Sequence, residues 1–289
     1  MPPRPPDDAG PVGTGSAAAP TPGPALPHGN PTEDPVPDEH RPQRRGGVRP
    51  TAVVSAVARL ADERSAHLGR PLEVLDLGGG TGGVAVPLAE AGHHVTVVDP
   101  SPDALAALAR RVREAGIVDR VTAVQGDGDS LDVLLAGRRV DLACCHGTLE
   151  FVDDPAATLR AVAQALGDDG VLSLLVAGRL SVVFAKAVAG EFAQARAALV
   201  DPSGRWGSTD PLPRRFDVDQ LEALLSDAGF HDVVVRGTNI LGHLVPAQLV
   251  DTEADRAALA ELDELLVAGP GREFLRTLGN ALHVTARRG

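Results

Sequence analysis

Tyrosine is absent from this sequence of 289 residues, and aromatic side chains of all kinds make up only 2% of it. The core must therefore be built from alanine, valine and leucine, and exposed aromatic side chains that stack nucleic-acid bases are not expected. The lack of tyrosine also argues against oxidoreductases that depend on a catalytic tyrosine. Lysine occurs once, at Lys186, and the net charge is −12. This charge argues against nonspecific binding of polyanions but leaves room for a local basic groove.

Cysteine is also scarce, with only Cys144 and Cys145, which are adjacent in an apolar run. Their spacing fits neither a disulfide nor a zinc site, so we expect no metal centre. Alternation along a strand would turn them to opposite faces as two small buried apolar residues. The sequence has no secretory leader and no apolar segment that could span a membrane, so we expect a cytoplasmic protein without a membrane partner.

Residues 1–48 differ in composition from the rest of the chain. They hold more than half of the 24 prolines and almost no large apolar residue. Such a segment cannot bury enough surface to offset the entropy of ordering it, so we predict a disordered tail. A targeting or binding role for the tail stays open, and residues 49–289 are predicted to form the folded domain.

Beyond the tail, short apolar runs alternate with helical patterns. The candidate strands are 72–77, 93–99, 121–127, 140–145, 170–177, 231–237 and 283–288. This alternation predicts an α/β fold, in which helices cover both faces of a parallel sheet. The segment 180–215 follows the fifth strand, and we consider it either a cap or lid over a bound substrate or an extra helix that completes the core.

Glycine is concentrated in the stretch VLDLGGGTGG, residues 74–83, directly after the first strand. Gly78, Gly80 and Gly83 fit the pattern G-x-G-x-x-G, which nucleoside-binding folds of several kinds share. No lysine follows the glycines, which excludes a triphosphate-binding P-loop. The remaining ligands are a dinucleotide such as NAD and S-adenosylmethionine.

Asp76 favours the second ligand because it lies two residues before the first glycine. A carboxylate there would repel a pyrophosphate and attract a ligand that carries an ammonium and a sulfonium. Alternatively, Asp76 only caps the loop or the next helix.

Two further acids follow later strands. Asp99 ends the second strand, 23 residues after Asp76, where a carboxylate accepts both ribose hydroxyls. Asp127 or Asp129, after the third strand, is placed to accept from an adenine amino group, although GDGDS also has the composition of an ordinary turn with a helix cap. Because the carboxyl ends of parallel strands share one edge, these acids predict a nucleoside site there.

The pieces VLDLGGGTG, VVD and HGTLEFVDDP together resemble class I S-adenosylmethionine-dependent methyltransferases. The strings HGTLEFV and VAGEF and the ending HVTARR are similar to the bacterial tRNA 5-carboxymethoxyuridine methyltransferases, from about Gly46 to the end of the chain. The resemblance implies a Rossmann-like sheet that is mostly parallel with its last strand antiparallel, and a helical cap insertion after the fifth strand. It also implies a tRNA carboxylate as the methyl acceptor.

The resemblance further implies which residues hold the cofactor. Arg49 would hold the methionine carboxylate, as an arginine suits a bidentate carboxylate contact. The other implied cofactor contacts are Gly78, Gly79, Gly80, Asp99, Asp127, Gly128 and His146. His146 follows the fourth strand, and we consider it a cofactor contact, a structural donor or a catalytic base.

Two departures from the family bear on the acceptor. The basic stretch after the cap helix is VDPSGRWGS in this chain, and the C-terminal aromatic positions are aliphatic or polar in GNALHVT. The remaining candidates for substrate binding are Arg205, Arg214 and Arg215. The alternatives to an RNA carboxylate methyltransferase are therefore a small-molecule O- or N-methyltransferase, an NAD-linked oxidoreductase and a cofactor-binding module without catalysis.

Overall fold

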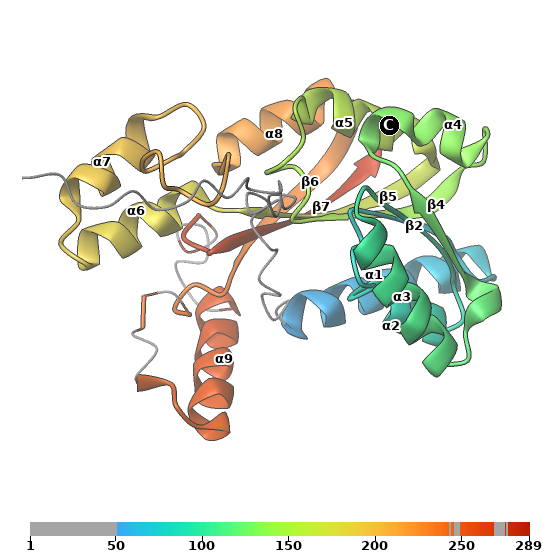
Figure 1. The fold of residues 1–289 in the computed structure, drawn as a ribbon, viewed down its shortest axis with the longest axis horizontal. Coiled ribbons are helices and arrows are strands. Elements are labelled where there is room, and N and C mark those ends of the chain that lie inside the picture. The colour runs from blue at the N-terminus through green and yellow to red at the C-terminus, as the bar shows by residue number, and fades with distance from the viewer. Residues whose placement is uncertain (1–50, 243, 246–248, 269–274, 276) are drawn as a thin grey trace, which may run out of the picture. The chain divides into compact units, whose positions relative to one another are not determined.

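The computed structural model describes residues 51–242, 244–245, 249–268, 275 and 277–289, so the predicted tail and Arg49 lie outside the described residues. Seven strands in this part of the chain form one sheet in the order β3-β2-β1-β4-β5-β7-β6 (Figure 1). The strands are β1 (Glu73–Leu77), β2 (His94–Asp99), β3 (Val121–Gln125), β4 (Val140–His146), β5 (Leu166–Ala177), β6 (Phe230–Thr238) and β7 (Ala281–Arg288).

The strand directions confirm the predicted sheet. Strands β1 to β5 pair in parallel, whereas β7 runs antiparallel to both β5 and β6. The chain builds outward from β1 to β3 on one side and then crosses to β4 on the other side. An open parallel sheet has its ligand-binding crevice at such a switch point, outside the carboxyl ends of the strands.

Helices cover both faces of the sheet (Figure 1). The helices of one face are α1 (Thr51–Leu68), α2 (Ala85–Glu90) and α3 (Pro102–Glu114). The helices of the other face are α4 (Leu131–Leu135), α5 (Pro155–Ala165) and α8 (Val218–Asp227). Both α3 and α5 begin with a proline after a capping side chain, since Ser101 accepts from the Ala104 amide and Asp154 accepts from the Ala157 amide. These are the start signals that the sequence contains.

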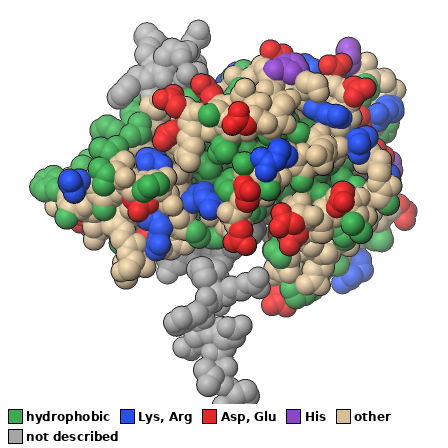
Figure 2. Space-filling model, turned by 90° about the horizontal axis from the view of Figure 1, so that it is seen from above, with side chains coloured by type: hydrophobic (Ala, Val, Ile, Leu, Met, Phe, Trp, Pro, Cys, Tyr) green, Lys and Arg blue, Asp and Glu red, His purple; other side chains and the backbone are tan. Residues whose placement is uncertain are grey.

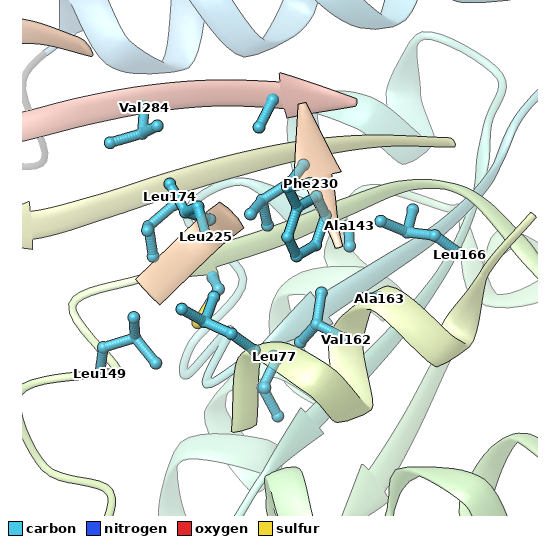
Figure 3. Packing of buried hydrophobic residues seen from close by; sticks show 14 of the residues in the cluster. Leu77, Ala143, Leu149, Val162, Ala163, Leu166, Leu174, Leu225, Phe230 and Val284 are labelled. Atoms are coloured by element: carbon cyan, nitrogen blue, oxygen red, sulfur yellow. The ribbon is translucent and has the colours of Figure 1, made fainter. Parts of the chain in front are cut away.

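The two cysteines divide between the faces as predicted. Cys144 belongs to the apolar cluster under α1 to α3, and Cys145 belongs to the cluster under α4, α5 and α8. Figure 3 shows the second cluster, in which Leu77 of β1, Val162 of α5 and Leu225 of α8 meet across the layer. Both cysteines are free and fully buried, and burial raises the pKa of the Cys145 thiol. They are therefore packing residues.

The structure differs from the expected elements in four places. β5 begins at Leu166 rather than at 170, and β3 ends at Gln125 because the chain turns there into the short 3-10 helix η2 (Gly128–Ser130). The segment after β5 is two helices, α6 (Arg179–Val188) and α7 (Phe192–Val200), with Gly190 between them at φ 76°. An additional helix, α9 (Glu253–Ala268), lies between β6 and β7.

The carboxyl end of β5 leads directly into α6, so α6 and α7 lie beyond that edge of the sheet (Figure 1). Within the part of the chain that the structure describes, no helix has the length and apolarity to cross a membrane.

Candidate functional site

The parallel strands bring most of the predicted site residues to one edge. The glycine loop follows β1, Asp99 ends β2, Asp127 follows β3 and His146 ends β4. Residues that are widely separated in the sequence thus lie along one edge of the sheet, on strands β3, β2, β1 and β4, which are neighbours in that order. Arg49 lies outside the described residues.

The glycine loop has no room for side chains at two positions. A Cβ atom at Gly78 would lie 2.0 Å from Thr148 Oγ1, and one at Gly79 would lie 2.5 Å from Asp76 Oδ2. Gly78 and Gly80 also have φ angles of 70° and 58°, which favour glycine. The Gly78 amide donates to the Val98 carbonyl at 2.7 Å and so fastens the loop to β2. The loop therefore exposes backbone instead of side chains to a ligand.

Asp76 lies beneath this loop and is fully buried. Its carboxylate lies where a Gly79 side chain would be, so in its ionised form it would act on a ligand through the glycine backbone. An ionised carboxylate at this place would disfavour a phosphate above the loop and favour a cationic group.

Asp99 connects the end of β2 to the glycine loop. Its Oδ2 accepts from the Gly80 amide and its Oδ1 from the Ser101 amide, both at 2.9 Å, and only 1% of the residue is exposed. Each carboxylate oxygen has a second lone pair, so the same group can accept hydroxyl hydrogens while holding the loop. This arrangement fits a nucleoside ribose.

Asp127 is exposed, and its side chain caps η2. It accepts from the Asp129 amide at 3.2 Å and from the Ser130 hydroxyl at 2.9 Å. The turn-and-cap alternative thus describes how this side chain is bonded in the structure. The neighbouring Gly128 is buried against Thr158, where a Cβ atom would approach Thr158 Cγ2 to 2.9 Å. The segment 127–128 is therefore held by contacts within the chain, and its adenine-binding role stays a prediction.

His146 is buried at the end of β4, and its Nε2 lies 2.9 Å from Ser173 Oγ on β5. Ser173 Oγ in turn lies 2.9 Å from Nε2 of His283 on β7. Neither Ser173 nor His283 is among the site residues predicted from the sequence. The available signal was a single polar residue, Ser173, within the apolar run GVLSLLVA.

Glu150, in the loop after β4, is buried as well. Its Oε1 accepts from the Ala177 amide at 2.7 Å, which joins the loop to the end of β5. Thr148 of the same loop donates to the Leu77 carbonyl at 3.1 Å. The loop 146–150 is therefore bonded to both neighbouring strands at the crevice.

The three candidate substrate arginines form hydrogen bonds to other residues of the chain. Arg214 donates to the carbonyls of Leu149 and Val152 at 3.1 and 2.6 Å. Arg215 is buried and forms a bidentate pair with Asp210, with N–O distances of 2.6 and 2.9 Å. Arg205 has only weak bonds, of 3.3 and 3.5 Å, to carbonyls of its own loop. Their contact with a substrate stays a prediction.

Comparison with known proteins identifies the family to which this site belongs. Residues 46–235 match the family described as a methyltransferase domain. The chain belongs to this family. The methyltransferase is 30% identical over 217 residues to the tRNA 5-carboxymethoxyuridine methyltransferase of Escherichia coli (strain K12), an alignment that covers 75% of this chain and 80% of the relative. It is also 31% identical over 129 residues to the ubiquinone biosynthesis O-methyltransferase of Azorhizobium caulinodans, which covers 45% of this chain and 49% of that protein.

A solved structure has the same fold. The crystal structure of magnesium protoporphyrin IX methyltransferase from Synechocystis PCC 6803, with bound S-adenosylhomocysteine, has a TM-score of 0.53 and 17% identity and covers 83% of each chain. The protein is thus a methyltransferase that depends on S-adenosylmethionine, rather than the NAD-linked oxidoreductase considered above. The glycine loop without side chains and the buried carboxylates of Asp76 and Asp99 fit this cofactor, which is a nucleoside with a positive charge and no phosphate.

Proposed function

We propose that this methyltransferase forms a methyl ester on a carboxylate, and that its acceptor is tRNA carrying 5-carboxymethoxyuridine. The observation that supports this acceptor is the length of the similarity to the tRNA methyltransferase. The aligned 217 residues exceed the domain match at 46–235, so the similarity extends beyond the common methyltransferase domain. The similarity to the ubiquinone enzyme covers less than half of the chain.

A carboxylate acceptor suits the groups that surround the crevice. S-adenosylmethionine supplies a methyl group on a positively charged sulfur. A carboxylate is already ionised at neutral pH and needs no general base. The protein then has to hold both partners in line and exclude water, which can lower the barrier by about 7–11 kcal/mol. In this proposal, Asp99 and the glycine loop hold the nucleoside, Asp127 and Gly128 border its adenine, and Arg49 holds the methionine carboxylate.

His146 acts as a cofactor contact in this proposal, rather than as a base. Its Nε2 is bonded to Ser173, which turns that nitrogen toward the sheet. A reaction on a carboxylate leaves no proton for it to remove.

The cap is the segment 180–215, and we assign it the role of a lid over the acceptor. It leaves and rejoins the sheet at one place, where the Phe216 amide donates to the Ala177 carbonyl at 2.9 Å and the Arg179 amide donates to the Phe216 carbonyl at 2.8 Å. Of the three predicted substrate arginines, Arg205 has the weakest internal bonds, so it is the one of the three most easily turned toward an RNA phosphate. A tRNA acceptor would also place the enzyme in the cytoplasm.

The test uses tRNA from a host strain that lacks this enzyme. Purified protein and S-adenosylmethionine with a labelled methyl group are incubated with this tRNA, and the Asp99→Ala variant is the inactive control. We expect label in tRNA that mild alkali releases as methanol, because a methyl ester is hydrolysed there and methyl groups on ring carbon or amide nitrogen are not. Label that resists alkali would refute the ester, and unlabelled tRNA would refute the acceptor.

A small-molecule acceptor is the second candidate, for O- or N-methylation. The observations that favour it are the net charge of −12 and the internal bonds of Arg214 and Arg215. The same incubation with a metabolite extract separates the two candidates. Label in a small molecule together with unlabelled tRNA supports the second candidate.

A further inference from the structure

A chain of three buried polar side chains crosses the wall of the crevice. His146 of β4, Ser173 of β5 and His283 of β7 are linked through the serine hydroxyl at two distances of 2.9 Å. The exposed fractions of these residues are 4%, 0% and 5%. The imidazole rings lie 6.0 Å apart at an interplanar angle of 88°, so they meet through the serine rather than by stacking.

The strand register explains the geometry of this chain. Leu175 of β5 pairs with His146 on one side and with His283 on the other, while Ser173 lies two residues earlier on the same strand. Both imidazoles therefore point their Nε2 atoms back along the sheet toward one hydroxyl. Side chains on a strand alternate, so all three lie on the face that also holds Cys144.

The number of hydrogens shared by these three side chains determines which Nε2 atoms carry a proton. Ser173 Oγ has two partners within the described residues, and its one proton must go to one of the two imidazoles, because a buried hydroxyl proton without an acceptor is costly. Burial, and to a lesser degree Arg236, lowers the pKa of His283 to about 4, so this ring is neutral at neutral pH. One Nε2 consequently donates to the hydroxyl and the other accepts from it.

We propose that Ser173 and His283 are positioning residues that fix the ring orientation and the Nε2 protonation of His146 at the cofactor site. His146 follows Cys145, which pairs with Leu77, the last residue before the glycine loop. Two residues later, Thr148 touches the loop at Gly78. A rotation of the His146 ring would therefore disturb the wall against which the cofactor binds. This inference rests on cofactor binding at the carboxyl edge and not on the identity of the acceptor.

The first measurement is the protonation of the rings by nitrogen-15 NMR of histidine-labelled protein at pH 7.5. The His146→Asn and His283→Leu variants assign the signals. We expect opposite states at Nε2, with a proton on one ring and none on the other. The Ser173→Ala variant should shift the His146 nitrogens, whereas Cys144→Ala should not. Cys144 is the control because it pairs with Ser173 in the sheet and is equally buried.

The second measurement is the affinity of the same variants for S-adenosylhomocysteine. Removing one partner from a buried hydrogen bond weakens the state that needs this bond, so we expect Ser173→Ala and His283→Leu to bind about tenfold more weakly. His283→Gln keeps an amide that can bond the hydroxyl, and it should bind within about threefold of the wild type.

The outcomes separate this inference from the cofactor assignment. A wild type that binds no S-adenosylhomocysteine would contradict the cofactor assignment. Equal Nε2 states of the two rings would overturn the hydrogen count. A shift of the His146 signals without a loss of affinity, or a loss of affinity without a shift, would overturn the positioning role.

Discussion

The crevice and the cap hold their polar groups in different ways. At the crevice, Asp99, Glu150 and His146 are buried and bond to backbone or side chains of neighbouring strands. In the cap, the bonds stay mostly within the segment, as in the pair of Arg215 and Asp210. The cap also exposes large apolar side chains, since Phe192 and Val188 are 71% and 72% exposed. Hydrophobic side chains gather at the left end of Figure 2, the end where Figure 1 shows α6 and α7.

This difference indicates that the crevice is held more firmly than the cap. Groups anchored to several strands cannot move without disturbing the sheet, so we expect the proposed cofactor site to be pre-formed. The cap is bonded to the sheet at its neck and to the loop after β4 through Arg214, and we propose that the rest of it adjusts to an acceptor.

Asp99→Ala should have the largest effect on the crevice. Each lost hydrogen bond to the charged carboxylate costs about 1.5–3 kcal/mol, so two ribose bonds correspond to a loss of at least about 100-fold in affinity for S-adenosylhomocysteine. Calorimetry measures this affinity. Asp103→Ala, an exposed acid in the first turn of α3, is the matched control. Unchanged binding by both variants would remove Asp99 from the site.

Arg215→Met should destabilise the cap without affecting cofactor binding. Removing one partner of a buried ion pair costs about 3–5 kcal/mol. Burial alone would raise the pKa of Asp210, but the bonds from Arg215 and from two backbone amides outweigh it, so the pKa of Asp210 is lowered. We expect faster proteolysis within the cap and normal binding of S-adenosylhomocysteine. The exposed Arg196 on α7 provides the control variant, Arg196→Met. An equal loss of cofactor binding would show that the two regions are not independent.

Lowering the pH should destabilise the wall of the crevice through His283. Burial lowers its pKa from 6.5 to about 4. Between these two pH values the unfolded chain is protonated at His283, whereas the folded chain is not. The free energy of unfolding should thus be unaffected above pH 6.5 and fall by up to about 3 kcal/mol as the pH drops toward 4. Urea unfolding at several pH values measures this slope. His283→Gln should flatten the slope, whereas replacement of the exposed His231 should leave it intact.

Alanine substitutions at two glycines with nearly equal φ angles distinguish the cost of steric crowding from the cost of backbone strain. Gly78 and Gly69 have φ angles of 70° and 67°, but a Cβ atom at Gly69 would have no neighbour within 4 Å. Both alanine variants lose about 1 kcal/mol to the left-handed conformation, and Gly78→Ala should lose about 1–3 kcal/mol more by displacing Thr148. Thr148→Ala added to Gly78→Ala should recover part of that difference in unfolding experiments. Equal losses would refute the close contact.

Phe192→Ser should have the smallest effect on stability and act only on the acceptor. The side chain is 71% exposed, so the free energy of unfolding should change by less than about 0.5 kcal/mol. If the cap covers the acceptor, the KM for the acceptor should rise about fivefold, since about 1 kcal/mol of apolar contact is lost. Val133→Ser, at an equally exposed position on α4, should leave KM unchanged. An unchanged KM in both would contradict the lid.

The sequence predicted those features whose signals are local. The alternation of strands and helices, the glycine loop and the acids at strand ends depend on residues close in the chain, and the sheet places them where expected. The link from Ser173 to His283 spans 110 positions and exists only because β7 inserts beside β5. The carbonyls that Arg214 contacts are likewise distant, at 65 and 62 positions. Asp210 lies only five positions from Arg215, but an arginine in a sequence does not reveal which nearby carboxylate will face it. Helix α9 lies in the section that the predicted elements left unassigned.

The pairing of Gly178 with Phe216 brings the two ends of the cap together, which bears on how methyltransferases of this family can evolve. A segment that leaves and rejoins the sheet at a single point can be lengthened, shortened or exchanged without any change in the order of the strands. Related enzymes can then change their acceptor by altering the cap alone, while the proposed cofactor site at the carboxyl ends of the strands stays the same.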